Sequence, residues 1–320
     1  MEQRSDVAGS IRREDSQSIR TRIGSAILAA LAGKEELETS IPGLTLAQRS
    51  QPVPPTSYLY SPSLAMIVQG RKNIVLGNSA YHYDETQFLL TAVNLPTITE
   101  VVQASPERPY ISIMLKLDLA AAKQIITDMD LEDAPAPAGS AMAVGPSTPQ
   151  LFDALARLID LLATPADIPI LGDLIQRELL YRVLTGPTGS RLRQIVRIGT
   201  QSNRVARAVT WLRENYQAPL RVEALAELSN MGLSTLHHHF RLMTSMSPLQ
   251  FQKHLRLHEA RRLLLSEEMD AGSAALAVGY ESATQFSREY RRLFGAPPLR
   301  DVKSLRLTHT VGLVQQDDTL

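Results

Sequence analysis

Hydrophobic positions along the chain repeat with two different periods, and the change of period divides the sequence. Between Leu44 and Lys116, short apolar runs with alternating polar residues are separated by turn residues. Such runs indicate the strands of a small β-barrel or sandwich, and they are LTLAQR, SLAMIVQG, KNIVLGN, QFLLTAVN, TITEVVQA and PYISIMLKL. In the C-terminal third, the apolar positions instead keep helical spacing.

Helices are also expected between these two parts. LDLAAAKQIITDM predicts one, and the Pro/Ala/Gly-rich stretch EDAPAPAGSAMAVGPSTP after it predicts a loop. A second helix has an apolar stripe, a third is expected from about Ile170 to Leu184, and residues 186–202 form the connection to the C-terminal part. The helix pair is expected to form a dimer interface, and packing against its own barrel is the alternative. The stripe consists of Leu151, Leu155, Leu158 and Leu162.

The C-terminal third begins with a helix from Val205, for which Asn203 is the expected N-cap. RVEALAELSNMGLSTLHHHFRLM then predicts two short helices across a tight turn at residues 229–232, which is a helix-turn-helix. The stripe of the second helix that is expected to face the core consists of Leu233, Leu236, Phe240 and Met243. Successive residues of a helix project about 100° apart, so the three consecutive histidines cannot converge on one metal ion. The residues left facing outward are Ser234, Thr235, His237, His238 and Arg241.

AGSAALAVGYESATQFSREYRRLFG repeats this unit. It supplies a short helix, a turn at residues 279–281, and a helix opened by Ser282 with Gln285 in a capping-box arrangement. A connecting helix from Pro248 to about Ser266 would be roughly 27 Å long at 1.5 Å per residue, near the ~34 Å between successive major-groove faces. The outward residues of the second unit are Ala283, Thr284, Ser287, Arg288 and Arg291.

These segments carry a family resemblance. MSPLQFQKHLRLHEARRLLL followed by VGYESATQFSREYRRLFGAPP resembles AraC/XylS-type bacterial transcription regulators, over residues 205–306. The resemblance implies double-stranded DNA as a partner, base contacts from the outward residues of both second helices, RNA polymerase as a further partner, and a homodimer. The chain departs from the family pattern at Asn230 and Ser245, where Gly is frequent, and at Gly232, where Ser is usual.

The N-terminal part carries a second resemblance. QGRKNIVLGNSAYHYDETQFLLTAVNLP is similar to the N-terminal domain of one AraC-type subfamily, a cupin-like β-barrel with a regulatory role, over residues 41–118. Barrel interiors of moderate polarity commonly hold small ligands, so an unknown small-molecule effector is expected. For each candidate lining residue a purely structural role is an open alternative. The candidates are Gln69, Arg71, Lys72, Tyr81, Tyr83 and Thr91.

Charge and composition narrow the function. Residues 1–200 hold 18 Lys and Arg against 21 Asp and Glu (net −3), whereas residues 201–307 hold 15 against 10 (net +5). A basic part of this kind is typical of nucleic-acid binding, and an ordinary solvated surface is the alternative. The chain has no Cys, which excludes disulfides and thiolate metal sites. The barrel segment has one histidine, His82, and a divalent ion needs three or more protein ligands, so we expect neither an enzyme nor a metal or other cofactor.

The arginines allow two interpretations. Arg288 can donate a bidentate pair to guanine, worth ~1–3 kcal/mol of discrimination. The others, among them Arg241, Arg256, Arg261 and Arg262, suit phosphate contacts or structural ion pairs with Glu259, Glu267 or Glu289.

We therefore expect an α+β protein: an N-terminal cupin-like β-barrel with flanking helices and a C-terminal all-α domain of two helix-turn-helix units joined by a linker helix. The expected function is an effector-responsive transcription regulator, most simply an activator, at the nucleoid in the cytoplasm and without a membrane segment. The alternatives are a regulator whose barrel only mediates dimerisation or protein contacts, and a metal-dependent cupin enzyme fused to a DNA-binding domain. The expected parts are an arm and helix (1–40), the barrel (41–147), a helical dimerisation segment (148–186), the DNA-binding domain (187–307) and a disordered tail (308–320), with disorder also up to about residue 16.

Overall fold

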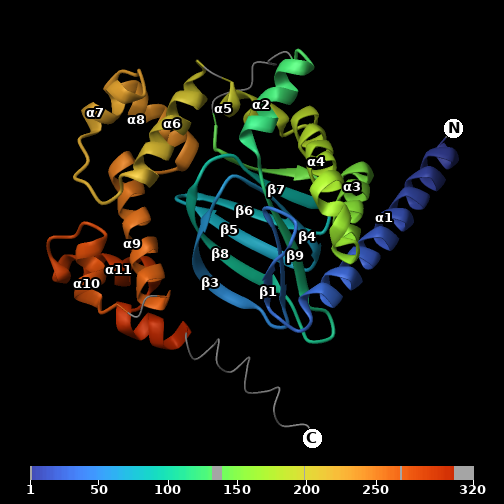
Figure 1. Cartoon of the computed structure of the whole chain (residues 1–320), viewed down its shortest axis with the longest axis horizontal. Helices are drawn as coiled ribbons and strands as arrows, with labels where there is room; N and C mark the ends of the chain where they lie inside the picture. Colours follow the sequence, from blue (N-terminus) through green and yellow to red (C-terminus); the bar gives the residue numbers. More distant parts are fainter. Residues whose placement is uncertain (1, 132–138, 198, 267–268, 306–320) are drawn as a thin grey trace, which may run out of the picture.

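A two-sheet barrel forms the N-terminal half of the computed structural model, which describes residues 2–131, 139–197, 199–266 and 269–305, with side chains from residue 17 (Figure 1). All recorded strand pairs are antiparallel. One sheet has the order β1-β2-β9-β4-β7-β10 and the other β3-β8-β5-β6. The strands are β1 (Glu36–Glu38), β2 (Leu44–Arg49), β3 (Val53–Tyr60), β4 (Ser63–Gln69), β5 (Arg71–Leu76), β6 (Ser79–Asp84), β7 (Gln87–Thr91), β8 (Leu95–Gln103), β9 (Tyr110–Lys116) and β10 (Met142–Pro146).

Strand β4 is apolar without interruption because both of its faces are covered. Residues from Ser63 to Val68 are all buried, with the barrel interior on one side and helix α1 (Glu2–Leu31) on the other. Ile23 and Ile27 of α1 are fully buried. A strand covered on both faces loses the alternation of a half-exposed strand, which accounts for the run SLAMIV.

Four strands differ from the sequence prediction. β1, β3 and β6 were not predicted, and β10 lies inside the stretch expected to be a loop, where Met142 pairs with Thr91 of β7. The chain is also helical from Glu2, whereas disorder was expected up to residue 16. Strand pairing overrides weak local propensity in β10, because an edge strand gains its hydrogen bonds from a neighbour distant in sequence. The predicted tail 308–320 lies outside the described residues.

The helices after the barrel pack mainly on their own chain. α2 (Leu119–Asp128) is capped by Asp118, and α3 (Pro149–Asp160) by Thr148. Short turns lead to α4 (Asp173–Thr185), and α5 (Gly189–Val196) lies within the segment expected to be a connection. α3 packs against both α1 and α4. Most of its leucine stripe is therefore buried intramolecularly, at Leu151, Leu155 and Leu158.

The C-terminal domain is all-helical. Its first helix, α6, is capped by the hydroxyl of Thr200, which accepts a hydrogen bond from Asn203 N at 3.0 Å, so the predicted cap at Asn203 was wrong by three residues. The helices are α6 (Gln201–Glu214), α7 (Val222–Leu228), α8 (Leu233–Thr244), α9 (Pro248–Ser266), α10 (Ala271–Ala277) and α11 (Ala283–Phe294), followed by a helical segment at 298–305.

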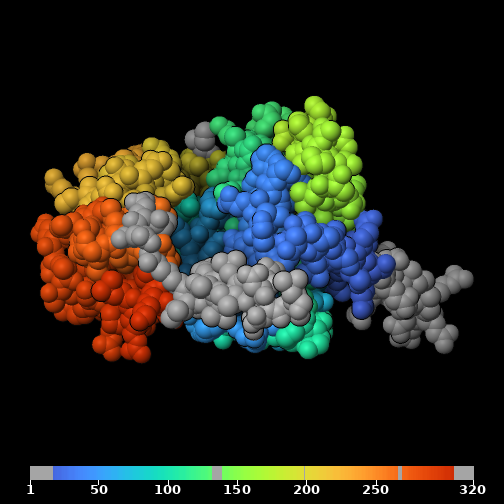
Figure 2. Space-filling view, turned by 60° about the horizontal axis from the view of Figure 1, so that its bottom comes forward, coloured from blue at the N-terminus to red at the C-terminus, as the bar shows by residue number. Residues whose placement is uncertain are grey.

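The two domains contact each other along the outer face of the sheet β3-β8-β5-β6, and Figure 2 shows the C-terminal helices as a lobe beside the barrel. Ser57 Oγ of β3 lies 2.9 Å from His258 Nε2 of α9. Ala141 N donates to the carbonyl of Met243 in α8 at 3.0 Å. The barrel is therefore packed directly on the helices that carry the helix-turn-helix units.

Candidate nucleic-acid interface

The first helix-turn-helix unit consists of α7, a tight turn and α8. Asn230 adopts a left-handed conformation with φ +52°, and Met231 N donates to the carbonyl of Ala226 at 2.9 Å. Asn is one of the few residues that visits this region readily. Ser245, with φ +58°, ends α8 in the same conformation. The turn therefore forms although Asn230 and Ser245 stand where Gly was expected.

The outward side of α8 carries the predicted base-contacting residues. Leu236, Phe240 and Met243 are buried, as the periodicity predicted, whereas Leu233, the fourth residue of the predicted stripe, is 42% exposed at the start of α8. Their burial fixes the rotation of the helix about its axis, because residues on the opposite side must face solvent. The residues that the structure leaves exposed include Ser234, Thr235, His237, His238 and Arg241.

The three histidines of α8 are not equivalent. His237 and His238 are exposed, whereas His239 is half-buried. Burial and the neighbouring His238 lower the pKa of His239, so its neutral form is favoured. Within the described part of the chain, no group of three or more His, Cys, Asp or Glu could hold a metal ion.

The second unit consists of α10, a turn and α11. Ser282 Oγ accepts a hydrogen bond from Gln285 N at 3.3 Å, which caps α11 as predicted. The Gln285 side chain instead donates to Glu289, so the reciprocal half of the expected capping box is not recorded. Ser287 is half-buried. The other predicted contact residues are exposed: Ala283, Thr284, Arg288 and Arg291.

Glu289 fixes α11 on the linker helix. Its carboxylate accepts hydrogen bonds from Lys253 Nζ and from the Tyr280 hydroxyl, both at 2.8 Å. Burial opposes ionisation of Glu289, but these bonds and that from Gln285 outweigh it and lower its pKa. α9 has 19 residues, ~28 Å at 1.5 Å per residue, and it contacts both α8 and α11. One helix thus carries both units.

Several arginines of the domain are structural. Arg261 forms a bidentate ion pair with Asp301 at 2.8 and 3.0 Å, and the two side chains are only 12% and 9% exposed. Its partner was not among the predicted ones, because Asp301 is brought to it only by the segment 298–305. Arg256 donates to four backbone carbonyls, and Arg262 pairs with Glu259 at 2.7 Å as predicted. A phosphate role for Arg261 is therefore excluded by its burial.

The arginines on the outward faces differ from these. In the described part of the chain, no ion pair is recorded for Arg241, Arg288 or Arg291. Their guanidinium groups are exposed, and a guanidinium has five donors in a planar fork that matches phosphate and guanine. The exposed faces of α8 and α11 therefore present cationic donors to an external partner.

A cavity of about 180 Å³ lies inside the barrel. Of the six candidate lining residues, the structure places Lys72 and Tyr83 there. The tyrosines and the arginine that other strands contribute to the lining were not predicted, although the alternation in VPPTSYLY indicates an inward row on β3. These further lining residues include Arg49, Tyr58, Tyr60 and Tyr110.

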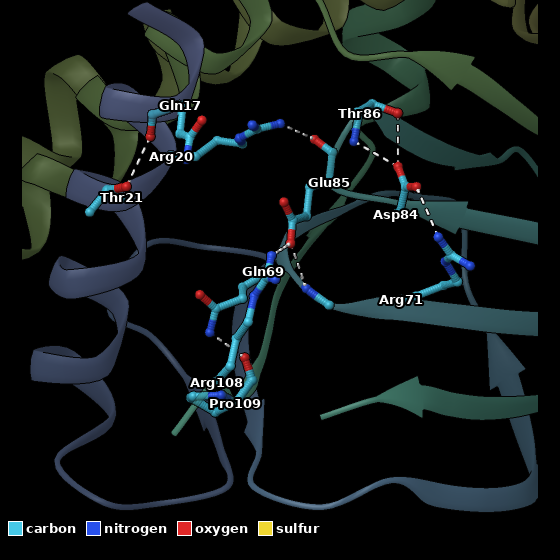
Figure 3. Close-up of polar contacts among 11 residues, drawn as sticks. Gln17, Arg20, Thr21, Gln69, Arg71, Asp84, Glu85, Thr86, Arg108 and Pro109 are labelled. Carbon is cyan, nitrogen blue, oxygen red and sulfur yellow. Dashed lines mark hydrogen bonds and ion pairs between the residues drawn. The ribbon is translucent and has the colours of Figure 1, made fainter. Parts of the chain in front are cut away.

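The other four candidates lie away from this cavity. Gln69 donates to the carbonyl of Pro109 at 2.7 Å, and Arg71 pairs with Asp84 at 3.8 Å (Figure 3). The Tyr81 hydroxyl donates to Ser140, and Thr91 is fully buried in β7. Arg71 alternates with the inward Lys72, whereas Tyr81 lies on the same face of β6 as Tyr83 but outside the cavity lining. A period of two does not by itself distinguish the two faces of a strand or locate the cavity along it.

Polar contacts at the barrel edge attach α1 to it (Figure 3). Arg20 donates to the carbonyl of Glu85 at 3.0 Å, and the Glu85 carboxylate accepts from Arg108 at 2.8 Å and from Gly70 N at 3.1 Å. His82 is exposed on β6 and lies 2.6 Å from Asn73 Oδ1. The polar residues of this edge thus have structural partners.

Comparison with known proteins gives two family models. Residues 40–191 match the AraC-type transcriptional regulator N-terminus, and residues 225–304 match a helix-turn-helix domain. The regulator CdhR of Pseudomonas aeruginosa is 28% identical over 144 residues, 45% of this chain and 43% of that protein. The activator RhaS of Pectobacterium carotovorum is 32% identical over 108 residues, 34% of this chain and 37% of that protein. The matches thus span less than half of these relatives.

Solved structures show the same fold. The crystal structure of ToxT from Vibrio cholerae, bound to (E)-4-(8-methylnaphthalen-1-yl)but-3-enoic acid, has a TM-score of 0.55 at 11% identity and covers 84% of this chain and 98% of that chain. The α+β architecture of barrel and helical domain is confirmed. No helix in the described residues has the length and apolar character needed to cross a bilayer. With a matching N-terminal model and a matching helix-turn-helix model, the chain belongs to the AraC-type family of transcription regulators, a family that is not enzymatic.

Proposed function

We propose that this protein binds double-stranded DNA in a sequence-dependent manner through α8 and α11, and that a small molecule in the barrel controls that binding. The proposal rests mainly on a difference between two groups of arginines in the C-terminal domain, namely whether their guanidinium groups have partners within the protein. Those of the linker helix are tied to internal partners, whereas Arg241, Arg288 and Arg291 are exposed on the outward faces. Unpaired guanidinium groups on two helices of a net-positive domain match the phosphates and base edges of a duplex.

The sheet β3-β8-β5-β6 supports the sensing part of the proposal. Tyr58 and Tyr60 of β3 line the cavity, whereas Ser57, the neighbour of Tyr58 in the strand, contacts His258 of the linker helix. Alternate residues of a strand point to opposite faces, so one strand touches both the cavity and the C-terminal domain. A ligand that favours one position of β3 shifts the docking equilibrium, because coupling requires a difference in affinity between two states.

The family setting supports the remaining parts. ToxT has been crystallised with an organic acid and with an unsaturated fatty acid, and the matched RhaS proteins are named activators. We propose an effector-responsive activator that works with RNA polymerase at the nucleoid. Part of the α4 region is an exposed apolar surface, with Ile170 69%, Leu174 60% and Tyr181 37% exposed. Exposed apolar patches of this kind mark interaction sites, and we propose homodimerisation there.

The same apolar surface favours one alternative, a regulator whose barrel serves only for dimerisation. The two functions differ in ligand dependence. Calorimetric titration of the full chain with metabolite pools distinguishes the two functions. Saturable binding supports the effector-responsive regulator, because a barrel that serves only for dimerisation has no small-molecule site.

Arg288→Ala tests the DNA-binding proposal. Specific binding should weaken by ~1–3 kcal/mol, with a relaxed preference at one base pair and little change on random DNA. Arg262→Ala is the matched control, since its guanidinium pairs with Glu259 on the same domain. Titration of the full chain with duplexes selected by genome-wide footprinting gives both values. Equal losses of Arg288→Ala on specific and random DNA would refute base contact by Arg288.

A further inference from the structure

The wall of the barrel cavity has an unusual composition. Four tyrosines and several Ser and Thr hydroxyls line it together with apolar side chains such as Ile113 and Met114. Burial raises the pKa of Tyr60 and Tyr83 well above the usual value, so these phenols stay protonated and can donate hydrogen bonds. The volume of about 180 Å³ corresponds to roughly six water molecules at ~30 Å³ each. The site therefore fits a small molecule with both apolar and acceptor groups.

Lys72 supplies a positive charge inside this cavity. Its Nζ lies 5.6 Å from the ring centroids of both Tyr58 and Tyr60. In the described part of the chain, no carboxylate is recorded within ion-pair distance of Lys72. Ring faces attract a cation, but more weakly than a carboxylate does in a partly buried site.

Arg49, the other cation of the cavity, is already neutralised. It lies 3.5 Å from Glu36 and 3.7 Å from Glu35, and it also donates to two backbone carbonyls. Both glutamates are more than half exposed, which places this ion cluster at the cavity mouth. The positive charge without a recorded counter-charge is thus that of Lys72, within reach of the tyrosine rings.

We propose that the barrel binds a small organic monocarboxylate, with its carboxylate on Lys72 and its apolar body against the aromatic and aliphatic wall. The inference rests on the proposed effector function and names the chemical class of the ligand. A partly buried cation without a counter-ion is unfavourable, so an anion gains more from this site than a neutral molecule of the same shape. A neutral isostere loses the charge-assisted hydrogen bond, worth about 1.5–3 kcal/mol.

The test uses the full chain and matched pairs of probes. Benzoate and hexanoate are titrated by calorimetry beside benzamide and hexanamide, which keep the shape and lose the charge. The variant Lys72→Met removes the charge at similar length, Lys72→Arg restores it, and Lys34→Met at an exposed turn is the control. We expect each acid to bind at least about tenfold more tightly than its amide, and Lys72→Met to abolish that preference.

The outcomes separate the ligand class from the regulatory function. Amides that bind as tightly as acids, acids that bind Lys72→Met unchanged, or a panel with no binder overturn the carboxylate inference. DNA titration is repeated with a saturating acid. Lys72-dependent binding of the acid without any change in DNA affinity keeps the inference and contradicts the sensing function. Binding of amides alone, with a change in DNA affinity, keeps the sensing function and contradicts the inference.

Discussion

The two helix-turn-helix units share a topology, but the hydrophobic core of the first is continuous with that of the barrel and the core of the second is separate. Leu236, Phe240 and Met243 of the first unit are part of one continuous hydrophobic cluster that extends through the barrel. Phe286 and Tyr290 of the second unit belong to a separate cluster with the end of α9. The first unit is thus packed as an extension of the barrel, whereas the second is a small body fixed by its own core and by charged groups.

The difference has a consequence for regulation. The hairpin between β5 and β6 reaches Ser245 at the end of α8, and a cavity of about 600 Å³ lined by Arg241 and Leu293 separates barrel and helices beside it. Arg241 and Ser245 lie on the side of α8 that also carries Ser234 and His238, because four residues advance about one turn. A change in barrel docking therefore reaches the first unit directly and the second only through α9.

The largest loss of stability is expected for a substitution that destabilises the second helix-turn-helix unit alone. Arg261→Ala leaves the carboxylate of Asp301 buried without its ion-pair partner and with the Tyr290 hydroxyl as its remaining donor. Removing one partner of a buried pair costs about 3–5 kcal/mol. Urea unfolding followed by circular dichroism should show this loss, against no more than about 1 kcal/mol for the exposed control Arg262→Ala. A loss below 1 kcal/mol for Arg261→Ala contradicts the structural role.

The turns of the two units should respond differently to the same substitution. Gly279 has φ +85°, and a Cβ there would lie 2.2 Å from the carbonyl oxygen of Gln217. Gly279→Ala should cost ~2–4 kcal/mol, from the left-handed backbone and the overpacking together. Asn230→Ala at the corresponding turn changes only the backbone preference and should cost ~1 kcal/mol. Equal losses for the two variants in urea unfolding would show that the close approach does not matter.

Lower pH should weaken the contact between barrel and linker helix. Burial lowers the pKa of His258 to about 3, and His254 and Arg261 add to that direction. The unfolded chain binds a proton near pH 6.5 and the folded chain does not, so stability is full above that pH and falls as pH decreases toward 3. Between pH 6.5 and 5 the loss from this group is about 2 kcal/mol. His258→Gln should flatten that part of the stability profile, and an unchanged profile contradicts the assignment.

The smallest loss is expected for a substitution that weakens the contact between the first helix-turn-helix unit and the barrel. Gly77 has φ +56°, and a Cβ there would lie 2.6 Å from the carbonyl oxygen of Ser245. Gly77→Ala should weaken docking by about 1–2 kcal/mol through strain and contact, seen as a larger radius of gyration in solution scattering. Gly199→Ala is the control, because Gly199 also has a positive φ but no atom within 4 Å of the added Cβ. An equal radius of gyration for both variants contradicts a docking role for this contact.

Local sequence pattern was enough to predict six of the strands, the helices of the C-terminal domain and the outward faces of α8 and α11. Periodicity is a local property, and burying Leu236 or Phe286 forces the opposite side of each helix toward solvent. The six strands predicted from alternating runs were found at β2, β4, β5, β7, β8 and β9. The left-handed conformation of Asn230 was also predictable, since Asn is one of the few residues that visits this region readily, whereas nothing in its residue type predicted the same conformation for Ser245.

Polar pairs between residues distant in the sequence, in contrast, depend on how the chain folds. Arg261 and Asp301 are 40 residues apart, and no local pattern distinguishes that arginine from Arg288. Strand alternation likewise leaves two faces open, so Lys72 and Arg71 could be told apart only when the barrel closed around one of them. Long-range packing fixes such partners, because the free energy of a charged group depends on what surrounds it after folding.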